Sequence, residues 1–307
     1  MSNAPPPGSA DPLALRGVVP PMLTIFDEDG DVDAAETAAH AAFVADAGVH
    51  AVFPLGTNGE FPLLSADERE HVVAAVADAV DVPVIAGVGA PGTRRTVANA
   101  ERAVAAGADG VVVVTPFYYP LDDEAARTHY RRVVEAVEVP VYGYQIPGRT
   151  GNRLSHDALD DLAALEGFAG MKDSSKDVPW LGRAVDEHPE LSFLVGSDSL
   201  LVPGLDLGCA GIVSALSNAF PELVVELYEA YDAGDRERAE ELQTTAYRAR
   251  HAIKQGPYLA GVKAALSLRD DVAVSPGAVR EPLRDFDPSE RSELASTLLQ
   301  LGLLDSL

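Results

Sequence analysis

The sequence predicts an α/β protein, a (β/α)₈ TIM barrel with three additional helices at its C-terminal end. Three observations lead to this fold class: short β-branched runs occur eight times, Ala-rich amphipathic segments separate them, and similar turns join the two. The runs are continuously apolar rather than alternating, as expected of parallel strands buried on both faces. A doubly wound open sheet is the alternative, but no Gly-x-Gly-x-x-Gly follows the first run.

The eight predicted strands each end in small or polar residues. Their junctions repeat, with Val-Pro-Val at residues 82–84 and 139–141, an Ala-Gly turn before two other runs and a similar Leu-Gly turn before a third. Strands and helices that alternate eight times through repeating junctions are typical of a closed parallel barrel. The predicted strands are residues 17–24, 49–54, 82–87, 110–115, 139–144, 168–172, 192–196 and 211–214.

Helix signals lie between these runs. Ser65 and Glu68 form a capping-box pattern that opens a helix to about Val80, and Thr93 or Thr96 is expected to cap the next one. Gly48 and Gly107 are expected to stop two of the helices. After the eighth run, residues 221–232 are predicted to close the barrel, and residues 236–254, 257–268 and 288–303 to form the added helices. The predicted domains are a disordered tail at residues 1–12, a barrel at 13–233 and a helical region at 234–307.

Composition excludes several classes of partner. The 307 residues carry 48 acidic and 23 basic side chains, a net charge of −25, which disfavours binding to nucleic acid or to an anionic membrane. Only four of the basic residues are lysines, and heavy acid excess with scarce lysine suggests a protein that works in high salt. A single cysteine, Cys209, and the lack of a signal-like N-terminus or a long apolar run predict a cytoplasmic protein. No His or Cys cluster suggests a metal site.

Active groups of such barrels lie at the C-terminal ends of the strands. The sixth predicted strand ends in Lys172, one of the four lysines. An apolar pocket disfavours an ammonium ion and so supplies a free amine as nucleophile, whereas arginine stays protonated. The alternative interpretation of Lys172 is a structural ion pair with Asp173.

Other strand ends carry groups that suit the same chemistry. Thr57 lies in a Leu-Gly-Thr-Asn-Gly-Glu loop whose backbone N–H groups can face a carboxylate. Tyr118 and Tyr144 can carry protons at the barrel mouth, with aromatic packing as the alternative, and Arg149 can clamp a carboxylate or phosphate. The seventh and eighth strands end in small polar residues, at Gly196-Ser197 and after Val213.

Together these motifs resemble the dihydrodipicolinate synthase/N-acetylneuraminate lyase superfamily. The Gly-Thr-Asn-Gly-Glu loop, the Tyr-x-x-Pro after the fifth strand and the Gly-x-Lys ending the sixth have the order and spacing of that family. The resemblance implies that Lys172 forms an imine with pyruvate or a related 2-oxo acid and that Tyr144 shuttles protons. It also implies that Thr57 links Tyr144 to a Tyr118 contributed across a subunit interface.

The resemblance further implies that the carboxylate is held by the backbone of residues 56–58, the Asn58 side chain and the Val213 main chain. Gly56, Asn58, Arg149, Val213, Gly196 and Ser197 are therefore the expected substrate-binding residues. It implies no cofactor and no metal, and a homotetramer. Asn58 departs from the family, which usually has Thr or Ser there, and Gln145 replaces the usual Asn.

The substrate is predicted from smaller features. Phe-Tyr-Tyr-Pro at 117–120 and Gly-Ser-Asp at 196–198 resemble archaeal 2-keto-3-deoxygluconate aldolases, so a pyruvate-dependent aldolase that cleaves 2-keto-3-deoxy-(phospho)gluconate is preferred. Arg-Thr-Gly at 149–151 instead resembles 4-hydroxy-tetrahydrodipicolinate synthases, which condense pyruvate with aspartate semialdehyde. A sugar-acid dehydratase and a non-catalytic barrel that binds a 2-oxo acid are the remaining alternatives.

Overall fold

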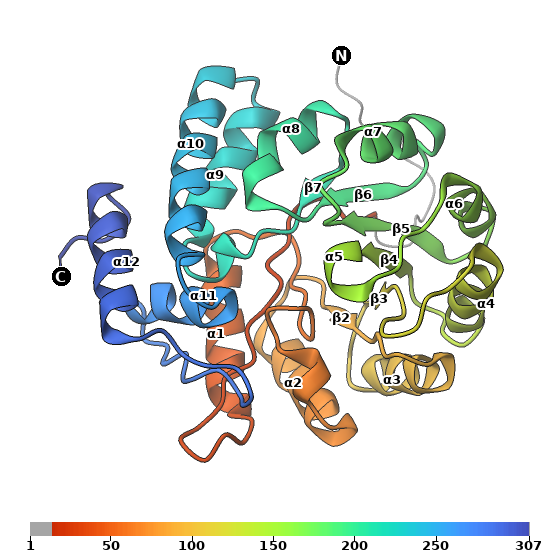
Figure 1. The fold of residues 1–307 in the computed structure, drawn as a ribbon, viewed down its shortest axis with the longest axis horizontal. Helices are drawn as coiled ribbons and strands as arrows, with labels where there is room; N and C mark the ends of the chain where they lie inside the picture. The colour runs from red at the N-terminus through yellow and green to blue at the C-terminus, as the bar shows by residue number, and fades with distance from the viewer. Residues whose placement is uncertain (1–13, 307) are drawn as a thin grey trace.

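A curled parallel sheet forms the centre of the protein in a computed structural model that describes residues 14–306. The predicted tail at residues 1–12 lies outside the described residues. The sheet has seven strands in the order β1-β7-β6-β5-β4-β3-β2, all paired in parallel (Figure 1). The strands are β1 Gly17–Val18, β2 Ile85–Gly87, β3 Gly110–Val114, β4 Val141–Gln145, β5 Phe168–Asp173, β6 Ser192–Val195 and β7 Gly211–Ile212.

The second predicted strand, residues 49–54, is not a regular strand. It makes one isolated parallel bridge, between Val52 and Val84, so the prediction of eight strands was wrong by one. The physical reason is the density of prolines: Pro20, Pro54 and Pro83 lack the N–H that an unbroken ladder needs. The segment still hydrogen-bonds in both directions, because the His50 N–H donates to Val18 of β1 and the Gly87 N–H of β2 donates to Pro54.

Helices surround the sheet, and in Figure 1 α2, α3, α4, α6 and α7 follow one another around its outside. The capping box of Ser65 and Glu68 is confirmed at the start of α2. The predicted Thr cap of α3 was wrong: Gly92 precedes the helix, and the hydroxyl of Thr93 bonds His129 instead. The helices are α1 Ala34–Asp46, α2 Ala66–Ala79, α3 Thr93–Ala105, α4 Asp123–Val134, α5 Pro147–Thr150, α6 His156–Ala163, α7 Val178–Glu187, α8 Leu201–Asp206 and α9 Pro221–Asp232, with short 3₁₀ turns η1 Phe61–Leu63, η2 Asp198–Leu200 and η3 Leu216–Asn218.

Three helices follow the α/β part of the chain, as predicted: α10 Arg236–Ile253, α11 Tyr258–Ser267 and α12 Pro288–Gln300. The buried face of α10 consists of small and aliphatic residues, and this helix packs against α9, α11 and α12. Among the described residues, no helix is long and apolar enough to cross a membrane. The three helices lie beside the sheet, on the left in Figure 1, and α10 and α11 contribute Arg250 and Tyr258 to the cavity described below.

Candidate active site

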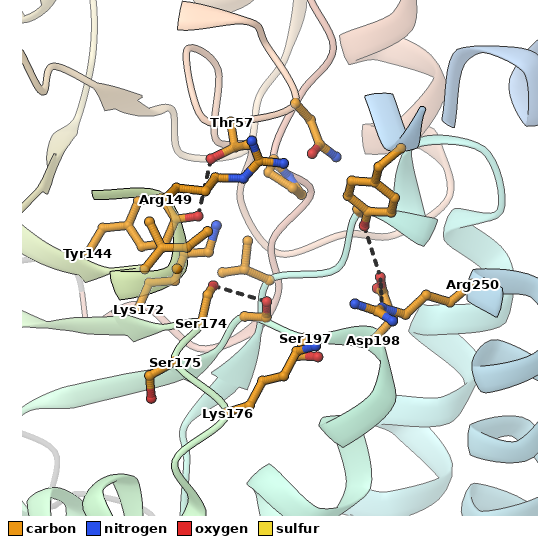
Figure 2. A pocket seen from close by; sticks show the side chains of 18 of the residues that line it. Thr57, Tyr144, Arg149, Lys172, Ser174, Ser175, Lys176, Ser197, Asp198 and Arg250 are labelled. Carbon is orange, nitrogen blue, oxygen red and sulfur yellow. Dashed lines mark hydrogen bonds and ion pairs between the residues drawn. The ribbon is translucent and has the colours of Figure 1, made fainter. Parts of the chain in front are cut away.

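A cavity of about 400 Å³ opens where the strands end at their C-terminal edge. Thr57 follows the 49–54 segment, Tyr144 and Lys172 are the next-to-last residues of β4 and β5, and the chain after β6 and β7 completes the wall. Figure 2 shows Lys172, Tyr144 and Thr57 close together on one side of the cavity, with Asp198 and Arg250 on the other. The lining residues are Pro21, Thr57, Asn58, Tyr144, Ile146, Gly148, Arg149, Lys172, Ser174, Ser175, Lys176, Gly196, Ser197, Asp198, Val213, Ala215, Arg250, Lys254 and Tyr258.

Lys172 is buried with only 5% of its surface exposed. Its Nζ lies 4.0 Å from the centre of the Tyr144 ring and 5.0 Å from that of Phe53. Burial lowers the pKa of Lys172, and this effect outweighs the opposite influence of Tyr144 and Asp198. The lysine is therefore biased toward the uncharged amine that can act as a nucleophile.

The alternative ion pair between Lys172 and Asp173 does not form. The Asp173 carboxylate accepts hydrogen bonds from Gln145 Nε2 at 3.1 Å and from the Ser175 hydroxyl at 2.9 Å. Consecutive strand residues point to opposite faces of a sheet, which separates the two side chains. Burial raises the pKa of Asp173, while its hydrogen bonds with Gln145 and Ser175 oppose this shift.

Tyr144 and Thr57 share a hydrogen bond of 3.2 Å between their hydroxyl oxygens. Burial raises the pKa of Tyr144, but the charge of Lys172 and hydrogen bonds from Thr57, Ser174 and Lys172 together lower it below its ordinary value. A phenol whose acidity is increased next to a buried amine can exchange a proton with it. The pair is thus suited to general acid–base catalysis.

The loop that carries Thr57 has an unusual backbone. Leu55 and Glu60, at its two ends, have left-handed backbone conformations with φ of 60° and 53°. Residues other than glycine rarely adopt this conformation. Gly59 packs so closely that an added Cβ would lie 3.1 Å from the Met22 carbonyl oxygen, and its own carbonyl accepts a bond from Thr24. Close packing therefore fixes the direction in which Thr57 and Asn58 project.

Two buried polar atoms in the cavity wall have neither a hydrogen-bond partner nor an ion-pair partner among the described residues. They are Asn58 Nδ2 and Ser197 Oγ, on side chains that are 3% and 5% exposed. Buried polar groups in native proteins are nearly always satisfied, so an unpartnered donor that lines a cavity indicates a place for a ligand oxygen.

Asp198 is buried on the far side of the cavity from Thr57. It accepts a 2.5 Å hydrogen bond from Ser214 and a 3.4 Å bond from Tyr258, and it lies 3.6 Å from Arg250 Nε. Burial and the neighbouring Asp198 raise the pKa of Tyr258 well above its ordinary value, so this phenol stays protonated. The group thus links the end of β6 to α10 and α11.

Basic side chains gather at this cavity although the chain is strongly acidic. Arg149, Lys176, Arg250 and Lys254 all line it, and we call them the basic cluster. The charge of Arg250, followed by burial and by the charges of Lys176 and Arg149, lowers the pKa of Lys254. Three of the four lysines of the sequence line this one cavity. An anionic ligand would find strong attraction here.

Eight of the ten predicted site residues line the cavity: Lys172, Tyr144, Thr57, Asn58, Arg149, Val213, Gly196 and Ser197. Gly56 is buried behind the loop against the Phe53 ring, and Tyr118 lies outside, 85% exposed, with a φ of 84°. Sequence reasoning missed the contributions of Lys176, Arg250, Lys254 and Tyr258, although the scarcity of lysine was a signal for two of them. Within residues 14–306, no three His, Cys, Asp or Glu side chains cluster as metal ligands.

Known proteins resemble this chain along almost its full length. The model of the dihydrodipicolinate synthetase family matches residues 14–301. A DapA-like lyase of Halobacterium salinarum is 65% identical over 305 residues, 99% of each chain, and a 4-hydroxy-tetrahydrodipicolinate synthase of Natronomonas pharaonis is 36% identical, covering 94% of this chain and 98% of that one.

Solved structures agree with this assignment. The structure of YagE, a prophage protein of Escherichia coli K12 in complex with pyruvate, is 32% identical and superimposes with a TM-score of 0.89 over 94% of this chain and 99% of its own. A dihydrodipicolinate synthase of Bacillus anthracis gives a TM-score of 0.88 at 30% identity, over 92% and 97% of the two chains. The chain belongs to the dihydrodipicolinate synthetase family, and it is a DapA-like carbon–carbon lyase.

Proposed function

We propose that the protein is a class I aldolase that forms an imine between Lys172 Nζ and the keto carbon of pyruvate. The observation that carries this proposal is the buried amine of Lys172 beside the acidified phenol of Tyr144. The amine attacks the keto carbon, Tyr144 protonates the departing hydroxyl, and water leaves. The pyruvate in the YagE complex supports a 2-oxo acid as the ligand class.

The imine supplies the driving force for carbon–carbon cleavage. Its protonated nitrogen draws electrons from the bond between C3 and C4 of a 2-keto-3-deoxy sugar acid once the C4 hydroxyl is deprotonated. The aldehyde then leaves, and the enamine that remains is protonated and hydrolysed to pyruvate and free Lys172. Tyr144, linked to Thr57 at 3.2 Å, is the group placed to move these protons.

The substrate carboxylate is expected at the loop that carries Thr57. Asn58 Nδ2 is a buried donor without a partner, and the main chain of Val213 borders the same part of the wall. A carboxylate oxygen there would accept a hydrogen bond from the Asn58 amide. The Ser197 hydroxyl offers a second donor that has no partner. Both groups favour a bound oxyanion over an apolar ligand.

The basic cluster favours a substrate with a second anionic group. Arg149, Lys176, Arg250 and Lys254 surround the cavity beyond Lys172, and their mutual repulsion is relieved by an anion. We therefore propose 2-keto-3-deoxy-6-phosphogluconate as the preferred substrate, cleaved to pyruvate and glyceraldehyde 3-phosphate. The non-phosphorylated sugar acid would leave Arg149, Lys176 and Lys254 without an anionic partner, whereas Arg250 already lies 3.6 Å from Asp198.

Condensation of pyruvate with aspartate semialdehyde is the second candidate. It is favoured by the name of the Natronomonas pharaonis relative and by the Arg-Thr-Gly sequence at 149–151, where Arg149 lines the cavity. The α-carboxylate of the semialdehyde also suits a cation, but it carries an ammonium group that the basic cluster repels. A dehydratase and a barrel that only binds a 2-oxo acid remain as outcomes of the test below.

We propose that the seven-stranded sheet closes into a barrel through the irregular segment at 49–54. The segment at 49–54 takes the eighth position, since Val52 exchanges backbone bonds with the 83–85 segment while Phe53 bonds Pro20 and Met22. The prolines limit its ladder without opening a gap, which supports closure and a packed interior.

The exposed Tyr118 supports assembly with a second copy of the chain. An apolar cavity of about 290 Å³ lies beside Thr57 and is lined by Phe61, Phe117 and Leu283. Tyr118 and Tyr119, which directly follow Phe117, are 85% and 69% exposed. We propose that a partner's Tyr118 enters this cavity and reaches Thr57, and that the dimers pair as a tetramer. Light scattering should give a dimer or tetramer mass, and Tyr118→Phe should lower kcat while keeping that mass.

Borohydride reduction in the presence of pyruvate tests the proposed function. An intact-mass gain equal to reduced pyruvate adduct, located at Lys172 and absent from Lys172→Met, is the expected result. An unmodified protein at saturating pyruvate would remove the aldolase and the synthase together. Three assays then identify the reaction. They measure release of pyruvate from the phosphorylated and non-phosphorylated sugar acids, condensation of pyruvate with aspartate semialdehyde, and loss of water from sugar acids.

A further inference from the structure

A buried ion pair lies outside the catalytic cavity and joins the loop that carries Thr57 to α11. Lys263 Nζ is 3.1 Å from Glu60 Oε1, and their side chains are 2% and 0% exposed. Lys263 is the one lysine of the sequence that does not line the active cavity. A charged pair this deep is unusual, because both groups lose their hydration when the chain folds.

Further bonds tie the same pair to the chain before α12. The second oxygen of Glu60 accepts the Arg280 backbone N–H at 2.9 Å, and Lys263 Nζ donates to the Ala278 carbonyl at 2.7 Å. The Lys263 nitrogen also lies 4.6 Å from the centre of the Phe26 ring. Glu60 is thus held by Lys263 and by Arg280, which both lie more than two hundred positions further along the sequence.

The position of Glu60 in its loop gives this anchor a consequence for catalysis. Its backbone N–H donates to the Thr57 carbonyl at 3.2 Å, so the two residues belong to one tight turn. Glu60 holds a left-handed φ of 53°, a conformation that persists only when surrounding contacts impose it. The contacts of its carboxylate with Lys263 and Arg280 are among those contacts, in addition to the close packing of Gly59, and the Thr57 hydroxyl projects from this turn.

We propose that Glu60 and Lys263 are positioning residues that keep the Thr57 hydroxyl within bonding distance of Tyr144. This inference rests on the proposed function, because it assigns Tyr144 the proton transfers. It gives the added helical region a role in the chemistry: α11 fixes the catalytic loop through Lys263. Neither residue lines the cavity that contains Lys172, although Glu60 borders the adjacent apolar cavity together with Thr57, so both would act through the loop that carries Thr57.

A buried ion pair is better suited to this role than to general stabilisation. The loss of hydration offsets much of the attraction, so an apolar pair of similar volume often gives equal stability. The charges restrict the conformations of the loop, because the two side chains must stay paired to compensate for their lost hydration. A loop whose hydroxyl must meet Tyr144 at 3.2 Å needs that restriction.

The first experiment compares Glu60→Gln with the parent enzyme. Glutamine keeps the shape of the side chain and can still accept the Arg280 N–H, but it lacks the charge that faces Lys263. The expected result is a fall in kcat of about ten- to hundredfold with a smaller change in KM, as for a group displaced by a fraction of an ångström. The double variant Glu60→Gln/Lys263→Met, which leaves no unpaired charge, should recover the stability but not the kcat.

A double-mutant cycle with Thr57→Val separates positioning from general damage. If Glu60 acts through the Thr57 hydroxyl, Glu60→Gln should lower kcat little further in the Thr57→Val background. Equal fold-losses in both backgrounds would overturn the proposal. Glu222→Gln is the matched control, since it removes a carboxylate 2.9 Å from Arg269, away from the cavity, and should leave kcat unchanged.

Imine trapping distinguishes failure of this inference from failure of the proposed function. Glu60→Gln should still be labelled at Lys172 by pyruvate and borohydride. Loss of label in the parent enzyme would contradict the proposed function itself. Normal label in both proteins with an unchanged kcat in Glu60→Gln would contradict only the positioning role.

Discussion

Tyr144 and Lys172 are register partners on the adjacent parallel strands β4 and β5, with the Lys172 Nζ 4.0 Å from the centre of the Tyr144 ring. Residues paired across two strands point to the same face of a sheet, so both side chains enter the cavity together. Burial lowers the pKa of the lysine, and the lysine in turn helps to lower the pKa of the phenol. One pairing in the sheet therefore provides both a nucleophile and its acid–base partner.

Tyr144→Phe should remove the proton transfer and leave the packing intact. The ring keeps its edge contact with Phe53, whose centre is 6.4 Å away, and Lys172 stays buried. We expect kcat to fall about 10²- to 10⁴-fold, the usual contribution of general acid–base catalysis. Single-turnover kinetics of imine formation and steady-state kcat measure the loss.

Tyr228→Phe is the control for this prediction. Tyr228 is also buried, but its hydroxyl donates to the Ala210 carbonyl and its side chain does not line the cavity. It should lower the free energy of unfolding by about 1 kcal/mol and leave kcat unchanged. Similar losses of kcat in the two variants would mean that packing, rather than proton transfer, explains the effect.

Lys172→Met should make the protein more stable at pH 7. The pKa of Lys172 is lowered in the folded state, so the unfolded chain binds its proton more tightly and the charged lysine opposes folding. This cost is fully present below the folded pKa and disappears as the pH rises to about 10.5, the unfolded value. Each pKa unit corresponds to about 1.4 kcal/mol. Tyr144 and Asp198, which face the amine, reduce the cost without removing it.

Urea unfolding at pH 7 and near pH 10.5 measures this effect. The stability gained by Lys172→Met should be present at the lower pH and shrink at the higher one. Lys176→Met, at an exposed lysine of the same cavity, should change the free energy of unfolding by less than about 0.5 kcal/mol. A Lys172→Met protein that is less stable than the parent at pH 7 would contradict a buried, destabilised charge.

Apolar runs predicted the central strands well and the proline-rich ones poorly. Residues 110–115 and 168–172 correspond closely to β3 and β5, where five or six consecutive residues form the ladder. The first run, 17–24, reduces to Gly17–Val18, because Pro20 and Pro21 cannot donate to a neighbour. An apolar run indicates that a segment is buried, whereas regular strand pairing also requires a backbone N–H at each hydrogen-bonding position.

The site was predictable where it depends on strand ends. Lys172, Tyr144 and Val213 reach the same cavity because parallel strands all end at one edge. Arg250 and Tyr258 were not predictable in this way, since they come from α10 and α11. The amphipathic pattern shows which helix face is buried, but not which part of a barrel that face covers.

Lys254→Met should weaken the binding of a phosphorylated substrate selectively. Lys254 belongs to the basic cluster but is exposed, so solvent screens its charge and the expected loss is only about three- to tenfold in KM. The non-phosphorylated sugar acid should show almost no change. Lys254→Arg keeps the charge and should keep the selectivity. Equal changes in KM for both substrates would contradict a distal anion site.

High concentrations of KCl should stabilise the protein. Many acidic side chains are exposed on the described surface, and the whole chain carries a net charge of −25. Repulsion among these charges extends over about 10 Å at 0.1 M salt but only about 3 Å at 1 M, so added salt relieves a cost of the compact state. The relative of 65% identity from Halobacterium salinarum supports adaptation to such conditions.

The midpoint of thermal unfolding should rise steadily from 0.1 to 2 M KCl, and it should rise less in a variant with ten surface Asp or Glu residues replaced by Asn or Gln. A midpoint that stays constant, or rises equally in both proteins, would mean that self-repulsion does not limit stability.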